Sequence, residues 1–269
     1  MYDLSDDPTA NKFMDIEETF APRPHLFFVG AKFAVVSWLS ASMALGILDE
    51  DPNFGFWFAY LSNWGMILTV LYAICSFVSA ALLAYYHRPP QQRRTELTGK
   101  IGVFLKITWT LFAVAFPAEL VITLLFWVLI YDGDDLTYTM FMIHGVAWVV
   151  IGIDGCCLSR IPLRMKQFIF VESFGVLYLV WSVLHSVLNV GNPWYTNKGE
   201  NDPIYSIVDW KDDTGFCIVL SVGLLFVGLP IIFLLCRALS RALPMHYRTD
   251  DDCEAFNDEE AIEVPTQES

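Results

Sequence analysis

Long uninterrupted apolar runs dominate the pattern of this chain. Six runs reach the roughly 20 residues that a helix needs to cross a hydrocarbon layer about 30 Å thick. They lack the strict polar and apolar alternation that is typical of membrane-barrel strands. The predicted spans are Leu26 to Leu48, Phe54 to Tyr86, Ile101 to Tyr131, Met140 to Leu158, Gln167 to Val190 and Phe216 to Leu239. We therefore predict an all-α fold, a six-helix transmembrane bundle that occupies residues 26–239.

Composition and charge support a membrane protein with two polar tails. The chain is 55% hydrophobic and only 17% charged, which excludes a disordered chain or an ordinary soluble domain. Its net charge of −14 lies almost entirely in the tails, because residues 249–269 contain nine acidic residues and no Lys or Arg. We expect a mobile acidic tail at 1–25 and a mobile, basic and then acidic tail at 240–269. No basic stripe is present, so a nucleic-acid partner is excluded.

The distribution of Lys and Arg predicts the orientation of the bundle. Twelve of them flank the spans on the side of the two termini, and only Lys198 and Lys211 lie on the opposite side. Cytoplasmic loops carry the excess of Lys and Arg, so both termini are predicted to be cytoplasmic. The first 25 residues lack the basic start of a signal peptide, and the first span is expected to act as an uncleaved anchor. We expect an integral multi-pass protein of the plasma membrane or endoplasmic reticulum.

The aromatic residues and cysteines constrain the fold and function less than the charged residues do. Five aromatic residues are expected at the outer boundary of the membrane, namely Trp57, Trp127, Tyr131, Trp194 and Trp210. The six cysteines show no spacing typical of a metal site, and no motif indicates a cofactor. Cys156 and Cys157 are open to two interpretations, palmitoylation or small side chains facing the bundle interior.

Several ionisable residues fall within the predicted spans, where charge is costly and commonly marks function or helix pairing. They are Lys32, Lys106, Glu119, His144, Asp154, Glu172 and His185. Charge pairs between helices are the simpler explanation for most of them, and transport is the alternative. Helical rise places Ser62, His144 and His185 in one layer of the outer leaflet.

Ser62 and His144 could form a nucleophile and its base, because a hydroxyl needs a base to accept its proton. A third member would come from another helix or from residues 191–215, where Tyr205 and Asp209 are available. Asn63 and His185 are candidates for substrate binding. The alternative is structural: a membrane serine commonly bonds the backbone one turn back, and a histidine commonly bonds another helix.

Several short strings together resemble a known family. They are Tyr60-Leu61-Ser62-Asn63-Trp64, Phe116-Pro117, Phe126-Trp127, Tyr131-Asp132, Ile143-His144-Gly145, Leu158-Ser159-Arg160-Ile161-Pro162 and Ile204-Tyr205-Ser206-Ile207-Val208-Asp209-Trp210. Their order and spacing resemble the rolling stone family of multipass membrane proteins. A more distant resemblance is to the androgen-induced-gene family of membrane hydrolases.

The two resemblances imply different functions. The hydrolases cleave fatty acid esters of hydroxy fatty acids with a threonine nucleophile and a histidine, and those positions fall on Ser62 and His144. This implies membrane lipids as partners and a fatty acid ester as substrate. The rolling stone relatives are associated with myoblast fusion, which implies a non-enzymatic membrane organiser. Its partner surface would include Trp194, Tyr195 and Trp210.

Overall fold

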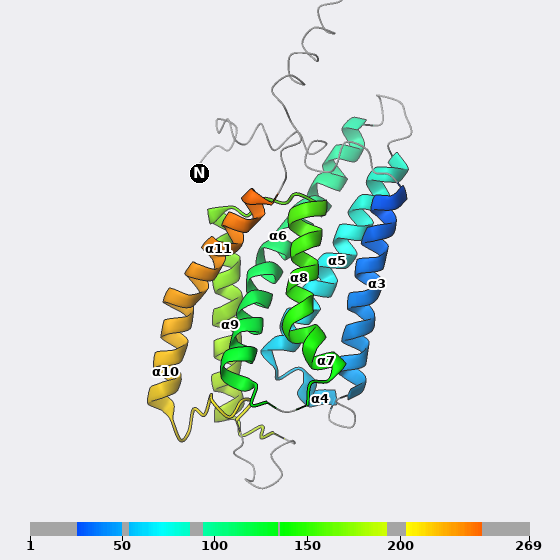
Figure 1. Cartoon of the computed structure of the whole chain (residues 1–269). Helices are drawn as coiled ribbons and strands as arrows, with labels where there is room; N and C mark the ends of the chain where they lie inside the picture. The colour runs from blue at the N-terminus through cyan, green and yellow to red at the C-terminus, as the bar shows by residue number, and fades with distance from the viewer. Residues whose placement is uncertain (1–25, 50–53, 87–93, 134, 193–202, 244–269) are drawn as a thin grey trace, which may run out of the picture.

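The computed structural model describes residues 26–49, 54–86, 94–133, 135–192 and 203–243. The predicted tail 1–25 and residues 244–269 of the predicted tail 240–269 lie outside these residues, whereas residues 240–242 continue the last helix. Every regular element in these ranges is a helix (Figure 1). Six helical segments are long and apolar enough to cross a membrane: Phe27–Leu48, Leu61–Leu82, Val103–Ile130, Tyr138–Leu158, Met165–Val187 and Thr214–Ala242. The predicted all-α fold with six spans is confirmed.

Most of the spans are built from more than one element. The elements are α3 (Leu26–Asp49), α4 (Phe54–Trp57), α5 (Leu61–Tyr86), α6 (Arg94–Leu125), η3 (Phe126–Ile130), α7 (Tyr138–Phe141), η4 (Met142–Val146), α8 (Ala147–Gly152), η5 (Ile153–Leu158), η6 (Met165–Gln167), α9 (Phe168–Val187), α10 (Thr214–Gly223), η7 (Leu224–Gly228) and α11 (Leu229–Ala242). Four of them are π-helical turns: η4 and η7 lie inside longer helices, and η3 and η5 form the C-terminal ends of theirs. Such turns are rare and occur frequently at functional sites.

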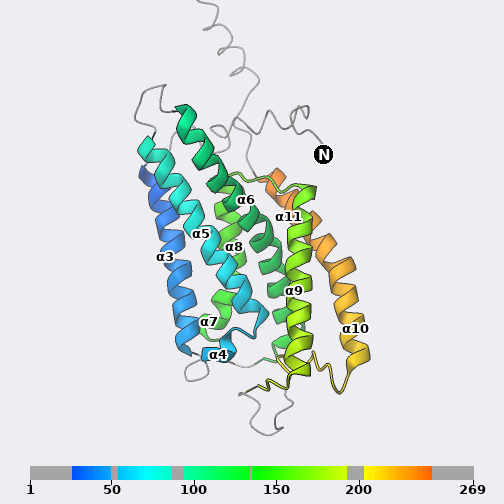
Figure 2. The same ribbon diagram turned by 180° about the vertical axis from the view of Figure 1, so that it is seen from behind.

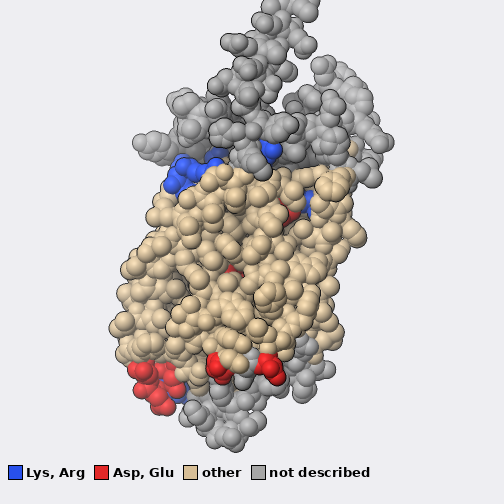
Figure 3. All heavy atoms as spheres, viewed as in Figure 1, with Lys and Arg blue, Asp and Glu red and all other residues tan. Residues whose placement is uncertain are grey.

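The surface of the bundle has the polarity of a protein that spans a hydrophobic layer. Figure 3 shows Lys and Arg at one end, Asp and Glu at the other, and a broad belt between them that is nearly free of charge. Large apolar side chains are exposed on the six candidate spans, including Phe33, Val128, Ile169, Val219 and Phe226. The orientation relative to the cytoplasm remains a prediction.

Two apolar clusters form the interior. The larger one joins α3, α5, α6 and α8 around Tyr72, Phe112 and Ile151, and the smaller one joins α6, α9 and α11 around Val171 and Phe233. At Gly155 the η5 turn packs directly against the ring of Phe112 on α6. A Cβ atom there would lie 2.0 Å from Phe112 Cε2, so this close approach requires glycine.

The second predicted span is not one continuous helix. The chain forms the short helix α4, breaks at residues 58–60, and then begins α5 at Leu61 (Figure 2). Ser62 was expected about two turns inside the second span, but it is the second residue of α5. The apolar run from Phe54 gave no sign of this break.

A buried ion pair joins the first and fourth spans. Lys32 Nζ lies 2.7 Å from Asp154 Oδ1, and each side chain is only 1% exposed. Hydrogen bonds complete the group: Tyr72 donates to Asp154 Oδ2 at 2.7 Å, and Ser76 donates to the same oxygen at 3.1 Å. Lys32 also donates to the hydroxyl groups of Ser76 and Ser159. The predicted role of charge pairs in holding helices together is confirmed for Lys32 and Asp154.

We expect Lys32→Met to destabilise the bundle by about 3–5 kcal/mol, because it leaves the Asp154 carboxylate buried without a cation. The measurement is thermal unfolding of the purified protein in detergent. Lys106→Met is the control, because Lys106 lies on α6 with an exposed side chain and should change stability little. The double variant Lys32→Met, Asp154→Leu should recover much of the loss. Equal stability of Lys32→Met and the control would contradict the assigned role.

Candidate functional site

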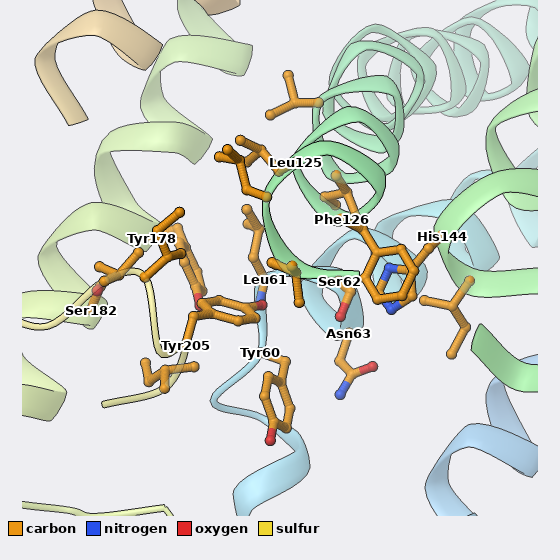
Figure 4. A pocket seen from close by; sticks show the side chains of 18 of the residues that line it. Tyr60, Leu61, Ser62, Asn63, Leu125, Phe126, His144, Tyr178, Ser182 and Tyr205 are labelled. Carbon is orange, nitrogen blue, oxygen red and sulfur yellow. The ribbon is translucent and has the colours of Figure 1, made fainter. Parts of the chain in front are cut away.

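A large cavity lies in the half of the bundle that contains α4 and α7. Its volume is about 1100 Å³, and its wall combines residues from many parts of the chain. These include the start of α5, the end of α6 with η3, the α7–η4 segment, α9, residues 204–210, α10 with η7, and a few residues of α3 and α4. The lining is mostly apolar, with polar groups gathered near the start of α5 (Figure 4).

The break before α5 exposes backbone groups, and side chains satisfy them. Asn63 Nδ2 donates to the carbonyl of Trp57 at 2.7 Å, and Trp64 Nε1 donates to the carbonyl of Phe58 at 2.7 Å. The next carbonyl, that of Ala59, accepts hydrogen bonds from α9. Such compensation is needed because lipid offers no hydrogen bonds to free backbone groups.

Two residues of the helix α9 bind the Ala59 carbonyl. The Tyr178 hydroxyl donates to it at 3.0 Å and Trp181 Nε1 donates at 3.3 Å. On the other side of the break, the N–H of Leu61 donates to the Tyr205 hydroxyl at 2.9 Å. The break is therefore held from α9 and from the segment that contains Tyr205.

Unlike the side chains of Asn63 and Trp64, the Ser62 side chain does not bind the carbonyls exposed by the break. It lines the cavity and is 8% exposed. A serine at the second position of a helix has no preceding turn in that helix whose carbonyl it could bond. The structural alternative for Ser62, a bond to the backbone one turn back, therefore does not apply here. Its hydroxyl interacts instead with that of Tyr205.

His144 lies at a bend in the fourth span. Its backbone angles, φ −101° and ψ 16°, are not helical and fall inside the π-helical turn η4. Residues in this sparsely populated region of backbone space are common in active sites. The Trp127 indole donates to the His144 carbonyl at 2.7 Å and so fixes the bend. The imidazole stacks on Phe126 with ring centroids 3.7 Å apart and an interplanar angle of 8°.

The structure brings Ser62 and His144 to one cavity from the second and fourth spans (Figure 4). Within the described residues no hydrogen bond joins them, and His144 Nδ1 is buried without a hydrogen-bond partner. The arrangement is thus a pair without an orienting carboxylate. Catalytic hydrogen bonds often tighten only when substrate is bound.

Tyr205 and Asp209, the two candidates for a third member of the Ser62 and His144 site, lie in different places. Tyr205 lies beside Ser62 in the cavity wall. Asp209 instead accepts hydrogen bonds from the N–H groups of Lys211 at 2.9 Å and Asp212 at 3.1 Å, and it does not line the cavity. Asp154 is held by Lys32 in the ion pair and is not available to His144.

The two candidates for substrate binding also differ. Asn63 lines the cavity, but its amide donates to the Trp57 carbonyl. His185 is 1% exposed, lies outside the cavity wall, and packs against the rings of Phe56 and Trp181. His185 therefore belongs to the packing of the C-terminal end of α9.

Two aromatic residues expected at the membrane boundary line the cavity. Trp57 is 2% exposed, and Trp210 donates its indole N–H to Ser182 at 2.9 Å. Both line the cavity. Trp194 and Tyr195 lie outside the described residues. Trp210 is half-buried, and its indole N–H binds within the bundle; its place in a partner surface stays a prediction.

Comparison with known proteins identifies the family. A sequence profile described as Protein rolling stone matches residues 32–250, most of the chain. The chain belongs to the rolling stone family. Neither the curated proteins nor the solved structures contain a match. The predicted resemblance to the rolling stone family is confirmed, and the family also agrees with an integral multi-pass membrane protein.

Two residues of the site had no assigned role in the sequence. Phe126, which covers the His144 ring, occurs in one of the strings typical of the rolling stone family. Tyr178 occurs in none of them. A tyrosine within an apolar span needs a hydrogen-bond partner, and this was the signal available for Tyr178.

We expect Asn63→Ala to lower the free energy of unfolding by about 1–3 kcal/mol, because the Trp57 carbonyl loses its donor while it stays buried. The measurement is thermal unfolding in detergent. Ser173→Ala is the control, since the exposed Ser173 hydroxyl bonds only the Ile169 carbonyl of its own helix at 2.7 Å. A loss for Asn63→Ala no larger than the control would show that the break does not depend on Asn63.

Proposed function

We propose that this rolling stone family protein is an intramembrane lipid-ester hydrolase, with Ser62 as nucleophile and His144 as general base. The observation that carries the proposal is that both side chains line one cavity of about 1100 Å³. Ser62 stands at a helix terminus, and His144 stands at a non-helical bend. Their positions also match the nucleophile and histidine that the distant hydrolase resemblance implies.

The first half of the reaction transfers the acyl group to the enzyme. The Ser62 oxygen attacks the ester carbonyl carbon while His144 accepts the hydroxyl proton. The carbonyl oxygen becomes an oxyanion in the tetrahedral intermediate. When this intermediate collapses, the bond to the leaving alkoxide breaks, and the alkoxide takes the proton from His144. The products are an acyl-Ser62 ester and a free alcohol.

The second half releases the acid. Water attacks the acyl-Ser62 carbonyl and gives a proton to His144. The second tetrahedral intermediate collapses, and Ser62 leaves with the proton that His144 returns. A fatty acid is released, and both side chains regain their starting forms.

The shape and chemistry of the cavity favour a lipid substrate. Its wall continues from Ser62 and His144 along apolar residues of α6, α9 and η7, including Val121, Leu179 and Leu225. An apolar tract with a few polar groups at one end is typical of a site for a ligand with a long hydrocarbon part and one polar group. An acyl chain placed along this tract would bring its ester group to the polar end.

We expect a fluorophosphonate probe to label the wild-type protein in membranes and to fail with Ser62→Ala, because the probe needs a serine nucleophile. His144→Gln should slow labelling by about 10²–10⁴-fold, since the hydroxyl loses its base. In-gel fluorescence after timed labelling gives both results.

Ser173→Ala is the matched control, because it removes an exposed hydroxyl from α9 and leaves the cavity unchanged. It should be labelled at the wild-type rate. Equal labelling of Ser62→Ala and the wild type would exclude Ser62 as the nucleophile and would favour a non-enzymatic membrane organiser.

We expect Ser221→Phe to reduce kcat/KM for a long-chain ester by at least about tenfold more than for an acetyl ester, because a ring at this position fills part of the apolar tract. Ser221 lines the cavity on α10, whereas the next residue, Val222, is 50% exposed on the outer surface. Val222→Phe is therefore the control and should leave both rates unchanged. Equal loss for the two esters would place the acyl chain elsewhere.

A further inference from the structure

The surroundings of the Tyr205 hydroxyl favour its use as a hydrogen-bond donor. Its oxygen accepts the N–H of Leu61 at 2.9 Å and lies close to the N–H of Ser62. A phenol has one proton to donate and two lone pairs to accept. With backbone donors directed at the oxygen, the capacity that remains at Tyr205 is donation of its own proton.

Two neutral hydroxyl groups, those of Ser62 and Tyr178, lie within hydrogen-bonding reach of the Tyr205 hydroxyl. Because the Tyr178 hydroxyl donates its proton to the Ala59 carbonyl, its oxygen can accept from Tyr205 but is only a neutral acceptor. Hydrogen bonds to a charged acceptor are roughly twice as strong as those between neutral groups. An oxyanion formed beside Ser62 would therefore attract the Tyr205 proton away from either hydroxyl.

Tyr205 also has the right protonation state to donate. Burial raises the pKa of Tyr205 above its ordinary value, so the phenol keeps its proton at neutral pH and cannot serve as a base. The two backbone N–H groups polarise the O–H bond, which strengthens it as a donor. Asn63, the other candidate donor next to Ser62, is engaged by the Trp57 carbonyl.

We propose that Tyr205 is a catalytic residue that donates a hydrogen bond to the oxyanion formed when Ser62 attacks an ester. This proposal rests on the proposed function. In the attack, the bond between Ser62 oxygen and the carbonyl carbon forms, and the carbonyl π electrons move to the oxygen. Tyr205 stabilises that oxygen and keeps its proton throughout, while the Ser62 proton passes to His144.

The test compares a ligand that forms an oxyanion with one that does not. A long-chain trifluoromethyl ketone forms a hemiketal oxyanion with a serine, whereas the corresponding secondary alcohol binds without one. Tyr205→Phe should raise the Ki of the ketone by about 100-fold, within the range found when one oxyanion donor is removed. The Ki of the alcohol should stay within about twofold. A purely structural role would raise both values together.

Tyr178→Phe is the matched control, because Tyr178 also supports the break by a hydroxyl hydrogen bond. It should not weaken the ketone selectively. Equal changes of both ligands in Tyr205→Phe, or no change in either, would overturn the role of Tyr205. If Ser62→Ala binds the ketone as tightly as the wild type, the hydrolase proposal itself fails.

A second variant keeps the test decisive if Tyr205→Phe does not fold. Replacing Tyr205 with 3,5-difluorotyrosine keeps the oxygen that binds Leu61 and makes the hydroxyl a more acidic donor. The ketone should then bind several-fold more tightly at a pH where the phenol stays protonated, with the alcohol unchanged. Unchanged binding of the ketone would overturn the proposal.

Discussion

The need to satisfy every backbone group without water shapes this bundle more than any single contact. The second span contains a break at residues 58–60, and the successive carbonyls of Trp57, Phe58 and Ala59 would otherwise be left without donors. The side chains of Asn63, Trp64 and Tyr178 supply those donors. The consequence is that a helix terminus stands inside the bundle, beside a cavity, and is held there by hydrogen bonds from its own first turn and from α9.

The polar residues of the membrane region divide into two groups with different chemistry. Around Lys32 and Asp154 every charge is matched by a counter-charge or a hydroxyl, so the group is complete and adds rigidity where α3, α5 and η5 meet. Around the cavity the groups are incomplete, since His144 Nδ1 has no hydrogen-bond partner. A complete network is typical of structure, whereas an incomplete one next to a cavity is typical of a site for a ligand.

The sequence predicted the six spans because long apolar runs are a strong and local signal. It could not predict the break before α5, because Phe54 to Tyr86 is predominantly apolar and several of the groups that bind the broken backbone come from α9 and from Tyr205. The pairing of Lys32 with Asp154 likewise depends on how spans pack. For the site, Ser62 and His144 could be selected from their expected depth in the membrane. The bend at His144 and its stacking on Phe126 depend on π-helical turns that no sequence pattern indicated.

The position of Ser62 bears on chemistry as well as on structure. Within the helix it would bond a carbonyl one turn back, and its hydroxyl would be a poor nucleophile. At the second position of α5 it has no such carbonyl, and the N–H groups of the first turn direct the positive end of the helix dipole toward the same region. Negative charge that develops on an attacked carbonyl would be stabilised there. The break that satisfies the backbone therefore also creates the electrostatic conditions that acyl transfer requires.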